Sequence, residues 1–171
     1  MKTDKIIFEN EPRFAPDYSP AQMIVLGVFG GNYFAYEHYK EDYSIESNIG
    51  LKLIEDIFEI HNIDKNILQY SLFSKYNVNK NYFKVKCGSE LWQWLDRGWI
   101  FEEDPYGWFE WYIKFYYGRR SYMDRTQINR WLNFKSRHSG MLKSHCQSHE
   151  VKKSLKTRQN LLHWAIDSTK V

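Results

Sequence analysis

The chain of 171 residues contains only two cysteines, Cys87 and Cys146. Two cysteines cannot form the disulfide framework of a small secreted scaffold, so the sequence favours a reducing compartment, cytoplasmic or nuclear. No apolar run approaches the roughly 20 residues that a membrane-spanning helix needs, and the first ten residues hold no apolar signal core. We therefore expect an intracellular protein with no membrane partner.

Apolar residues make up 43% of the chain and charged residues 26%, which argues against a disordered or fibrous protein. The length is ordinary for one domain and is sufficient to bury a core. No internal repeat or low-complexity tract is visible. We expect a single domain over residues 1–171, in which residues 1–13 are the candidate for a flexible end.

The net charge of +3 conceals a division of charge along the chain. Residues 1–110 hold 11 Lys and Arg against 18 Asp and Glu, which gives −7, whereas residues 111–171 hold 13 against 3, which gives +10. A basic half of this size is typical of a surface for an anionic partner. The alternative is that the acidic half packs against the basic half and neutralises it.

Hydrophobic spacing predicts a mainly α fold, a compact single helical domain around a central aromatic helix. Asp104-Pro105 is a helix start signal and Gly118 is a stop signal for that helix. Its large apolar residues recur at i, i+3, i+4, i+7 and i+8, as Trp108, Trp111, Tyr112, Phe115 and Tyr116. A helix so apolar on nearly all sides belongs in the middle of a domain.

Capping residues and apolar stripes predict the other elements. The strongest extended segment is residues 82–86, so at most a short β segment is expected there. The expected helices begin at Ser19-Pro20, near Asn48, near Asn66, at Ser89, at Asp124 with Gln127 as its capping partner, and at Ser154 or Thr157.

Several short motifs rich in Gly, Trp and Arg follow one another along the chain. They are GVFGGNYF at 27–34, VNKNYFKVK at 78–86, WLDRGWI at 94–100, DPYGWFEWY at 104–112, GRR at 118–120, RTQINRW at 125–131 and RQNLLHW at 158–164. Together, over about residues 14–167, they resemble a widespread family of small uncharacterised proteins. The resemblance implies a single compact body, and it carries over no established activity and no catalytic role. Cys87 stands where the family pattern leads us to expect Ala, which argues against a shared catalytic cysteine.

The leading functional hypothesis is a sequence-tolerant nucleic-acid surface in the basic half. Affinity for nucleic acid comes mainly from neutralised phosphates, and exposed rings such as Tyr122 can stack on bases. Some of the cations fall at the start of the last helix, where the helix dipole disfavours them, and this favours an anionic ligand. The candidate contacts are Arg119, Arg120, Arg125, Arg130, Trp131, Arg137, Lys152, Lys153 and Arg158.

A structural interpretation of the same residues stays open. The aromatic residues would then form the core, and Arg119, Arg120 or Arg130 would pair with nearby carboxylates such as Asp104. The second functional hypothesis is a small enzyme for an anionic metabolite or nucleotide. Its pocket would lie beside the Arg119–Arg120 turn, and the candidate lining residues are Trp108, Trp111 and His138. A third hypothesis is a protein-interaction module anchored by exposed Trp and Tyr.

The sequence gives only weak signals of a metal site or of a catalytic nucleophile. His145, Cys146 and His149 are ligand types that suit zinc, but no second pair of ligands accompanies them. Cys146 beside a histidine is also the minimum for a thiolate nucleophile. No serine elbow, metalloprotease helix or phosphate loop is present, so the sequence assigns neither a cofactor nor a catalytic residue.

Overall fold

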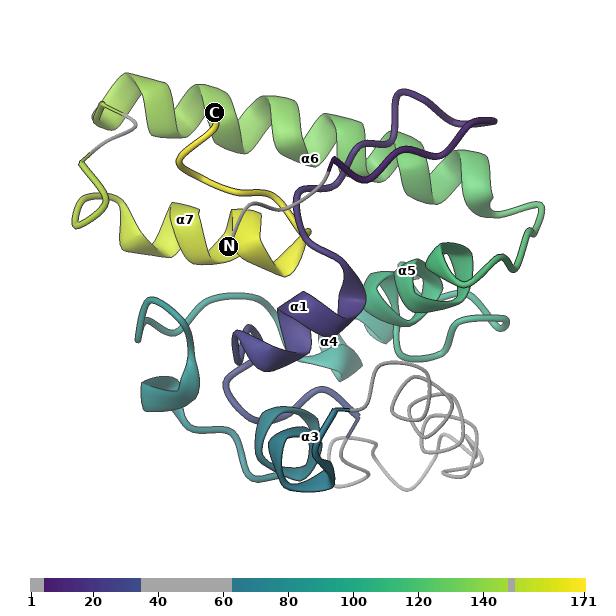
Figure 1. Cartoon of the computed structure of the whole chain (residues 1–171), viewed down its shortest axis with the longest axis horizontal. Helices are drawn as coiled ribbons and strands as arrows, with labels where there is room; N and C mark the ends of the chain where they lie inside the picture. The colour runs from purple at the N-terminus through teal and green to yellow at the C-terminus, as the bar shows by residue number, and fades with distance from the viewer. Residues whose placement is uncertain (1–4, 35–62, 148–149) are drawn as a thin grey trace.

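The computed structural model describes residues 5–34, 63–147 and 150–171 (Figure 1). These residues form a mainly α-helical structure with an aromatic-rich core, which confirms the predicted fold class. The elements are α1 (Pro20–Val25), α3 (Lys65–Leu72), the 3-10 helix η2 (Val78–Lys80), α4 (Leu91–Asp96), α5 (Trp108–Tyr116), α6 (Asp124–His145) and α7 (Leu155–His163). The helix predicted to begin near Asn48 lies outside the described residues.

Ser19 caps α1 as predicted. Its side-chain oxygen accepts a hydrogen bond from the Gln22 amide (3.2 Å), and the Gln22 side chain accepts one from the Ser19 amide (2.8 Å). This reciprocal pair satisfies two amide groups that the helix itself leaves free. The helix ends at Val25, because Gly27 has a left-handed backbone with a φ of 66°.

The starts of α4 and α6 differ from the prediction. Glu90, not Ser89, caps α4, and its amide donates to the Gln93 side chain (3.1 Å). Asp124 is the first residue of α6 rather than its cap. Its carboxylate accepts bonds from the Ser121 amide and the Trp111 indole (2.9 Å each), so it joins α6 to the preceding turn and to α5. The start of α7 after Ser154 is as predicted.

The central helix α5 begins at Trp108, later than Asp104-Pro105, because Gly107 before it has a φ of 89° that does not continue a helix. Most of its side chains are buried. Phe14, from the N-terminal segment, packs against the rings of α5 and of Trp131, with centroid distances of 5.1 to 6.4 Å. The prediction of a buried aromatic helix at the centre is confirmed.

The described residues contain no β-sheet, and their β pairing is limited to two isolated bridges, Asn32 with Phe73 and Phe101 with Asp104. Residues 82–86 form no strand. Lys84 has a φ of 54°, which breaks an extended backbone, and its amide donates to the Asn81 carbonyl (3.0 Å) to close a turn.

The helices α6 and α7 lie side by side and antiparallel along one edge of the molecule (Figure 1). Trp131 on α6 joins them, since its indole nitrogen donates to the Trp164 carbonyl at 2.8 Å. With 22 residues, α6 is about 33 Å long. It is therefore long enough to present an extended surface.

Candidate functional site

One side of α6 is exposed to solvent along its length. The residues on this side are Arg125, Asn129, Arg130, Asn133, Ser136, Arg137, Gly140 and Lys143, which we call the α6 face. Arg130 is half-buried and the others are exposed. The one acidic residue of α6, Asp124, is buried on the opposite side. The α6 face therefore carries cations and no carboxylate.

The α6 face has its charges at two edges and small uncharged side chains between them. At about 100° per residue, Arg125 and Lys143 fall on one edge, and Arg130 and Arg137, seven residues apart, fall on the other. The strip between them includes Asn129, Asn133, Ser136 and Gly140. This arrangement suits a polyanion whose phosphates flank the helix axis, because short side chains along the centre permit a close approach.

Two exposed rings accompany the α6 face. Tyr122, just before α6, is 77% exposed, and Trp99 is 46% exposed. Arg130 donates to the Trp99 carbonyl (3.0 Å), which places that loop against α6. Trp131, the stacking residue named from sequence, is only 1% exposed, so that prediction is wrong. It lies on the apolar stripe of α6 and serves as a link to α7.

The two arginines before α6 have different surroundings. Arg119 makes two parallel hydrogen bonds to Asp104 (2.7 Å each), the structural pairing that the sequence left open. Arg120 is exposed, but its guanidinium covers the Phe115 ring at 4.0 Å and donates to the Phe115 carbonyl (2.8 Å). Arg119 is thus held in the fold, and Arg120 keeps an exposed edge beside Tyr122.

The cations around α7 do not join the α6 face, because they follow the far end of α6. Arg158 is fully buried, so the prediction that it contacts phosphate is wrong. Its guanidinium donates to the carbonyls of Lys153 (2.9 Å) and Ser168 (3.1 Å). Lys153 is exposed and forms an ion pair with Glu150 (2.6 Å), whereas Lys152 lines a pocket. The nine predicted contacts therefore do not form one patch.

The predicted pocket beside the Arg119–Arg120 turn is contradicted by the positions of the three residues that were expected to line it. Trp108, Trp111 and His138 are all buried. The Trp111 indole donates to Asp124 (2.9 Å), and the His138 ring stacks on Phe134 with a centroid distance of 3.7 Å. Neighbouring side chains occupy the space around these three residues, because they belong to the core.

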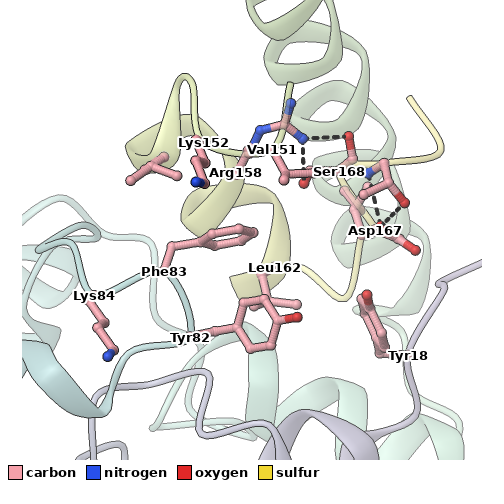
Figure 2. Close-up of a pocket in the computed structure, with 13 residues that line it drawn as sticks. Tyr18, Tyr82, Phe83, Lys84, Val151, Lys152, Arg158, Leu162, Asp167 and Ser168 are labelled. Atoms are coloured by element: carbon pink, nitrogen blue, oxygen red, sulfur yellow. Dashed lines mark hydrogen bonds between the residues drawn. The ribbon is translucent and has the colours of Figure 1, made fainter. Parts of the chain in front are cut away.

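A pocket of about 710 Å³ opens elsewhere, between residues 82–84, residues 151–155 and residues 166–169 (Figure 2). Side chains of α7 and Tyr18 complete its wall. Sequence reasoning missed this site because its parts come from four separate segments. The only local signal was the motif at 78–86, which contains Tyr82, Phe83 and Lys84 but has no spacing that suggests a ligand.

Left-handed backbone is concentrated at this pocket. Among the described residues, the non-glycine residues with positive φ are Lys84 (54°), Ser154 (54°) and Ala165 (56°). Lys84 lines the pocket, and the other two each precede a lining residue. Such conformations cost about 1 kcal/mol or more each and gather at ligand sites. These conformations hold the three segments that border the pocket in positions that a right-handed or extended backbone would not reach.

The residues with weak metal or nucleophile signals do not gather into a site. His145 is exposed, and its Nδ1 lies 2.6 Å from the Met141 carbonyl oxygen. The Cys146 thiol donates to the carbonyl of Leu142 (3.5 Å), and His149 lies outside the described residues. Within residues 5–34, 63–147 and 150–171, no group of three or more His, Cys, Asp and Glu side chains could hold a metal ion.

A cysteine–histidine contact that was not expected from the sequence joins Cys87 and His163. Cys87 Sγ lies 4.0 and 3.8 Å from the two ring nitrogens of His163, and His163 Nε2 donates to the Val28 carbonyl (3.1 Å). Burial raises the pKa of Cys87 to about 12 and lowers the pKa of His163 to about 4. Both groups are neutral at pH 7, the reverse of the thiolate–imidazolium pair of a cysteine nucleophile.

The buried His163 predicts an acid-sensitive fold. Unfolded histidine, with a pKa of 6.5, takes up a proton as the pH falls below that value, whereas the folded pKa is about 4. Acid therefore favours the unfolded chain, and His163 alone should lower the free energy of unfolding by about 2 kcal/mol between pH 7 and pH 5. Urea unfolding at both pH values measures this loss. His163→Gln keeps a donor for Val28 and should show a correspondingly smaller loss; equal losses in both proteins would refute the assignment.

No family model, curated protein or solved structure matches the chain. The family resemblance of the motifs therefore stays a prediction, and the function is argued from geometry. No helix in the described part of the chain has the length and apolar character needed to cross a bilayer.

Proposed function

We propose that the protein binds nucleic acid through the α6 face, by phosphate contacts that tolerate sequence. The observation that supports this most is an exposed helical face about 33 Å long with cations on both edges and no carboxylate. Since each strand of a duplex carries a phosphate about every 3.4 Å along the axis, this face would span about ten base pairs.

The cations on this face are available for a partner. Arg125, Arg137 and Lys143 are exposed, and none of their side chains makes a hydrogen bond or ion pair with another described residue. Arg120 and Arg130 flank them, and the rings of Tyr122 and Trp99 lie nearby for stacking on an unpaired base. Asn129 and Asn133, one helical turn apart, would meet sugars or base edges between the phosphates.

The alternative hypothesis, an enzyme with a pocket at Trp108, Trp111 and His138, has no support at that place, because these side chains are buried. The structural alternative is that the basic residues only neutralise acidic residues within the fold. It accounts for Arg119 and Lys153, which are paired with Asp104 and Glu150, but not for the unpaired cations of the α6 face.

The test is a fluorescence-anisotropy titration of labelled single- and double-stranded DNA and RNA at two salt concentrations. We expect the triple variant Arg125→Ala, Arg137→Ala, Lys143→Ala to bind on the order of 100-fold more weakly at 0.1 M salt. The slope of log affinity against log salt should fall by about 3. Substituting exposed side chains leaves the fold intact, which circular dichroism checks.

The matched control removes three exposed lysines from the acidic half, as Lys65→Ala, Lys75→Ala and Lys86→Ala. This variant has the same net charge as the α6 triple variant. If both variants lose affinity equally, the effect is one of net charge and the α6 face is not the binding surface. Unchanged affinity in the α6 variant, or no binding by the natural protein at low salt, would overturn the proposal.

A further inference from the structure

The exposed aromatic rings beside the α6 face lie only near the start of the helix. Tyr122 comes two residues before Asp124, the first residue of α6. Trp99 is bonded to Arg130, which lies about 9 Å along the helix axis from Asp124. Between Arg130 and the end of α6 at His145, a stretch that the structure describes completely, no Phe, Tyr or Trp side chain is exposed. The α6 face therefore has a ring-bearing start and a ringless remainder about 22 Å long.

The backbone of Trp99 is fixed while its ring remains accessible. The Trp99 amide donates to the Trp94 carbonyl (2.9 Å), and the Trp99 carbonyl accepts from Arg130 (3.0 Å). The ring is 46% exposed, and the Arg97 guanidinium lies over it at 4.9 Å from the centroid. An indole ring is a surface on which any base can stack. Because Trp99 is already held in place, a base that stacks on its exposed part does not first have to order this loop.

The loop that carries Trp99 also carries carboxylates, unlike α6 itself. Glu102 and Glu103 are exposed and follow Phe101, whose ring lies 4.7 Å from the Arg130 guanidinium. Two carboxylates at this end of the α6 face would repel the closely spaced phosphates of a duplex. An unpaired strand can turn a base toward Trp99 and its phosphates toward solvent. The ring-bearing start therefore suits unpaired bases better than paired ones.

The ringless remainder of the α6 face suits the opposite form of nucleic acid. Bases inside a duplex are stacked and paired, so an exposed ring reaches them only at an end or where a base is unpaired. Duplex phosphates are accessible along the whole length of both strands. Arg137 and Lys143 lie on opposite edges of the remainder, and neither side chain makes a hydrogen bond or ion pair with another described residue. A length of about 22 Å would span about six base pairs.

We propose that the α6 face binds a junction between paired and unpaired nucleic acid. The duplex lies along the ringless remainder, and the first unpaired bases stack on Trp99 and Tyr122. This inference rests on the proposed nucleic-acid function and specifies the form of the partner. It requires no preference for any base, because each base has a face that can stack.

The first experiment compares three labelled probes with equal numbers of phosphates, by fluorescence anisotropy of the full chain at one salt concentration. The probes are a blunt duplex, a single strand, and a shorter duplex with a single-stranded overhang; a non-nucleotide linker closes one end of each duplex and keeps it paired. We expect the overhang probe to bind on the order of tenfold more tightly than either of the others. A blunt duplex or a single strand that binds as tightly as the overhang probe would overturn the inference.

Replacing Trp99 tests the stacking itself. Trp99→Ala keeps both backbone bonds of this residue, and it should weaken the overhang probe by about tenfold while the blunt duplex stays within about twofold. The salt slope should not change, because the ring carries no charge. Trp99→Phe should restore most of the affinity. The matched control is Tyr70→Ala, which removes a ring that is 55% exposed on α3 and should leave all three probes unchanged. Circular dichroism checks that each variant is folded.

The α6 triple variant separates this inference from the function on which it rests. It should weaken all three probes, because it removes phosphate contacts. If it weakens none, the proposed function fails. If it weakens all three but Trp99→Ala and Trp99→Phe bind the overhang probe as the natural protein does, only the junction inference fails. Junctions of this kind occur in both DNA and RNA, so each probe is made in both forms, and the form that shows the stronger preference for the overhang identifies the partner.

Discussion

Replacing Arg158 with alanine is expected to lower the free energy of unfolding by about 3–5 kcal/mol. The guanidinium is fully buried and donates to carbonyl oxygens of Lys153, Glu150 (3.2 Å) and Ser168, so it ties the loop after α6 and the C-terminal segment to α7. Alanine would leave these buried acceptors without their donor and would open a cavity. Urea unfolding followed by circular dichroism measures the change.

Lys156→Ala is the matched control, because it removes one cation from an exposed position of the same helix. We expect it to change stability by less than about 0.5 kcal/mol. Arg158→Lys keeps the charge but cannot reach several carbonyls at once, so it should recover only part of the loss. A free energy of unfolding for Arg158→Ala within about 1 kcal/mol of the natural protein would show that the loop and the C-terminal segment do not depend on this side chain.

The sequence indicates that Arg158 is buried, although a count of charges does not show it. Arg158, Leu161, Leu162 and Ala165 follow the spacing i, i+3, i+4 and i+7, which puts the arginine on the apolar stripe of α7. His138 occupies the same kind of position on α6, seven residues after Trp131 and four before Leu142. Periodicity thus predicts which polar residues are buried, whereas a count of charges does not.

The helical architecture could be predicted because it depends on local spacing. The buried face of α5 and the cap of α1 at Ser19 follow from residues within one or two turns. Helix starts were harder to predict where a side chain forms a hydrogen bond with a residue far away in the sequence. Asp124 resembles a cap in sequence, but its carboxylate also accepts from Trp111, thirteen residues earlier.

The pocket could not be predicted, because its residues approach one another only in the folded chain. Tyr18 and Asp167 are separated by nearly the whole sequence. They meet because the segment around Asp17 pairs with the C-terminal segment: the Asp17 amide donates to the Ala165 carbonyl (2.8 Å), and the Asp17 carboxylate accepts from the Asp167 amide (2.9 Å). Which cations are exposed is likewise a property of packing. Arg119 and Arg125 are both basic residues near the start of α6, yet only Arg125 is without an ion pair among the described residues.

Arg119→Ala is expected to cost about 3 kcal/mol of stability, since it removes the main partner of a buried carboxylate. Asp104 is fully buried, and its oxygens accept two bonds from Arg119 (2.7 Å each) and one from Lys114 (3.1 Å). The remaining lysine neutralises the carboxylate but cannot replace the bidentate geometry. Urea unfolding of Arg119→Ala, with the exposed Arg125→Ala as the control for charge, measures the effect.

A double-mutant cycle with Asp104→Asn tests whether the two side chains act as a pair. Removing either side chain leaves the other buried without its partner. The double variant should therefore lower the free energy of unfolding by about 2 kcal/mol less than the sum of the two single variants. The same variants also bear on function, because an arginine held by a buried carboxylate cannot turn outward to a phosphate without breaking that pair. Arg119→Ala should therefore leave nucleic-acid affinity unchanged while it lowers stability. Additive costs, together with weakened nucleic-acid binding, would instead place Arg119 among the phosphate contacts.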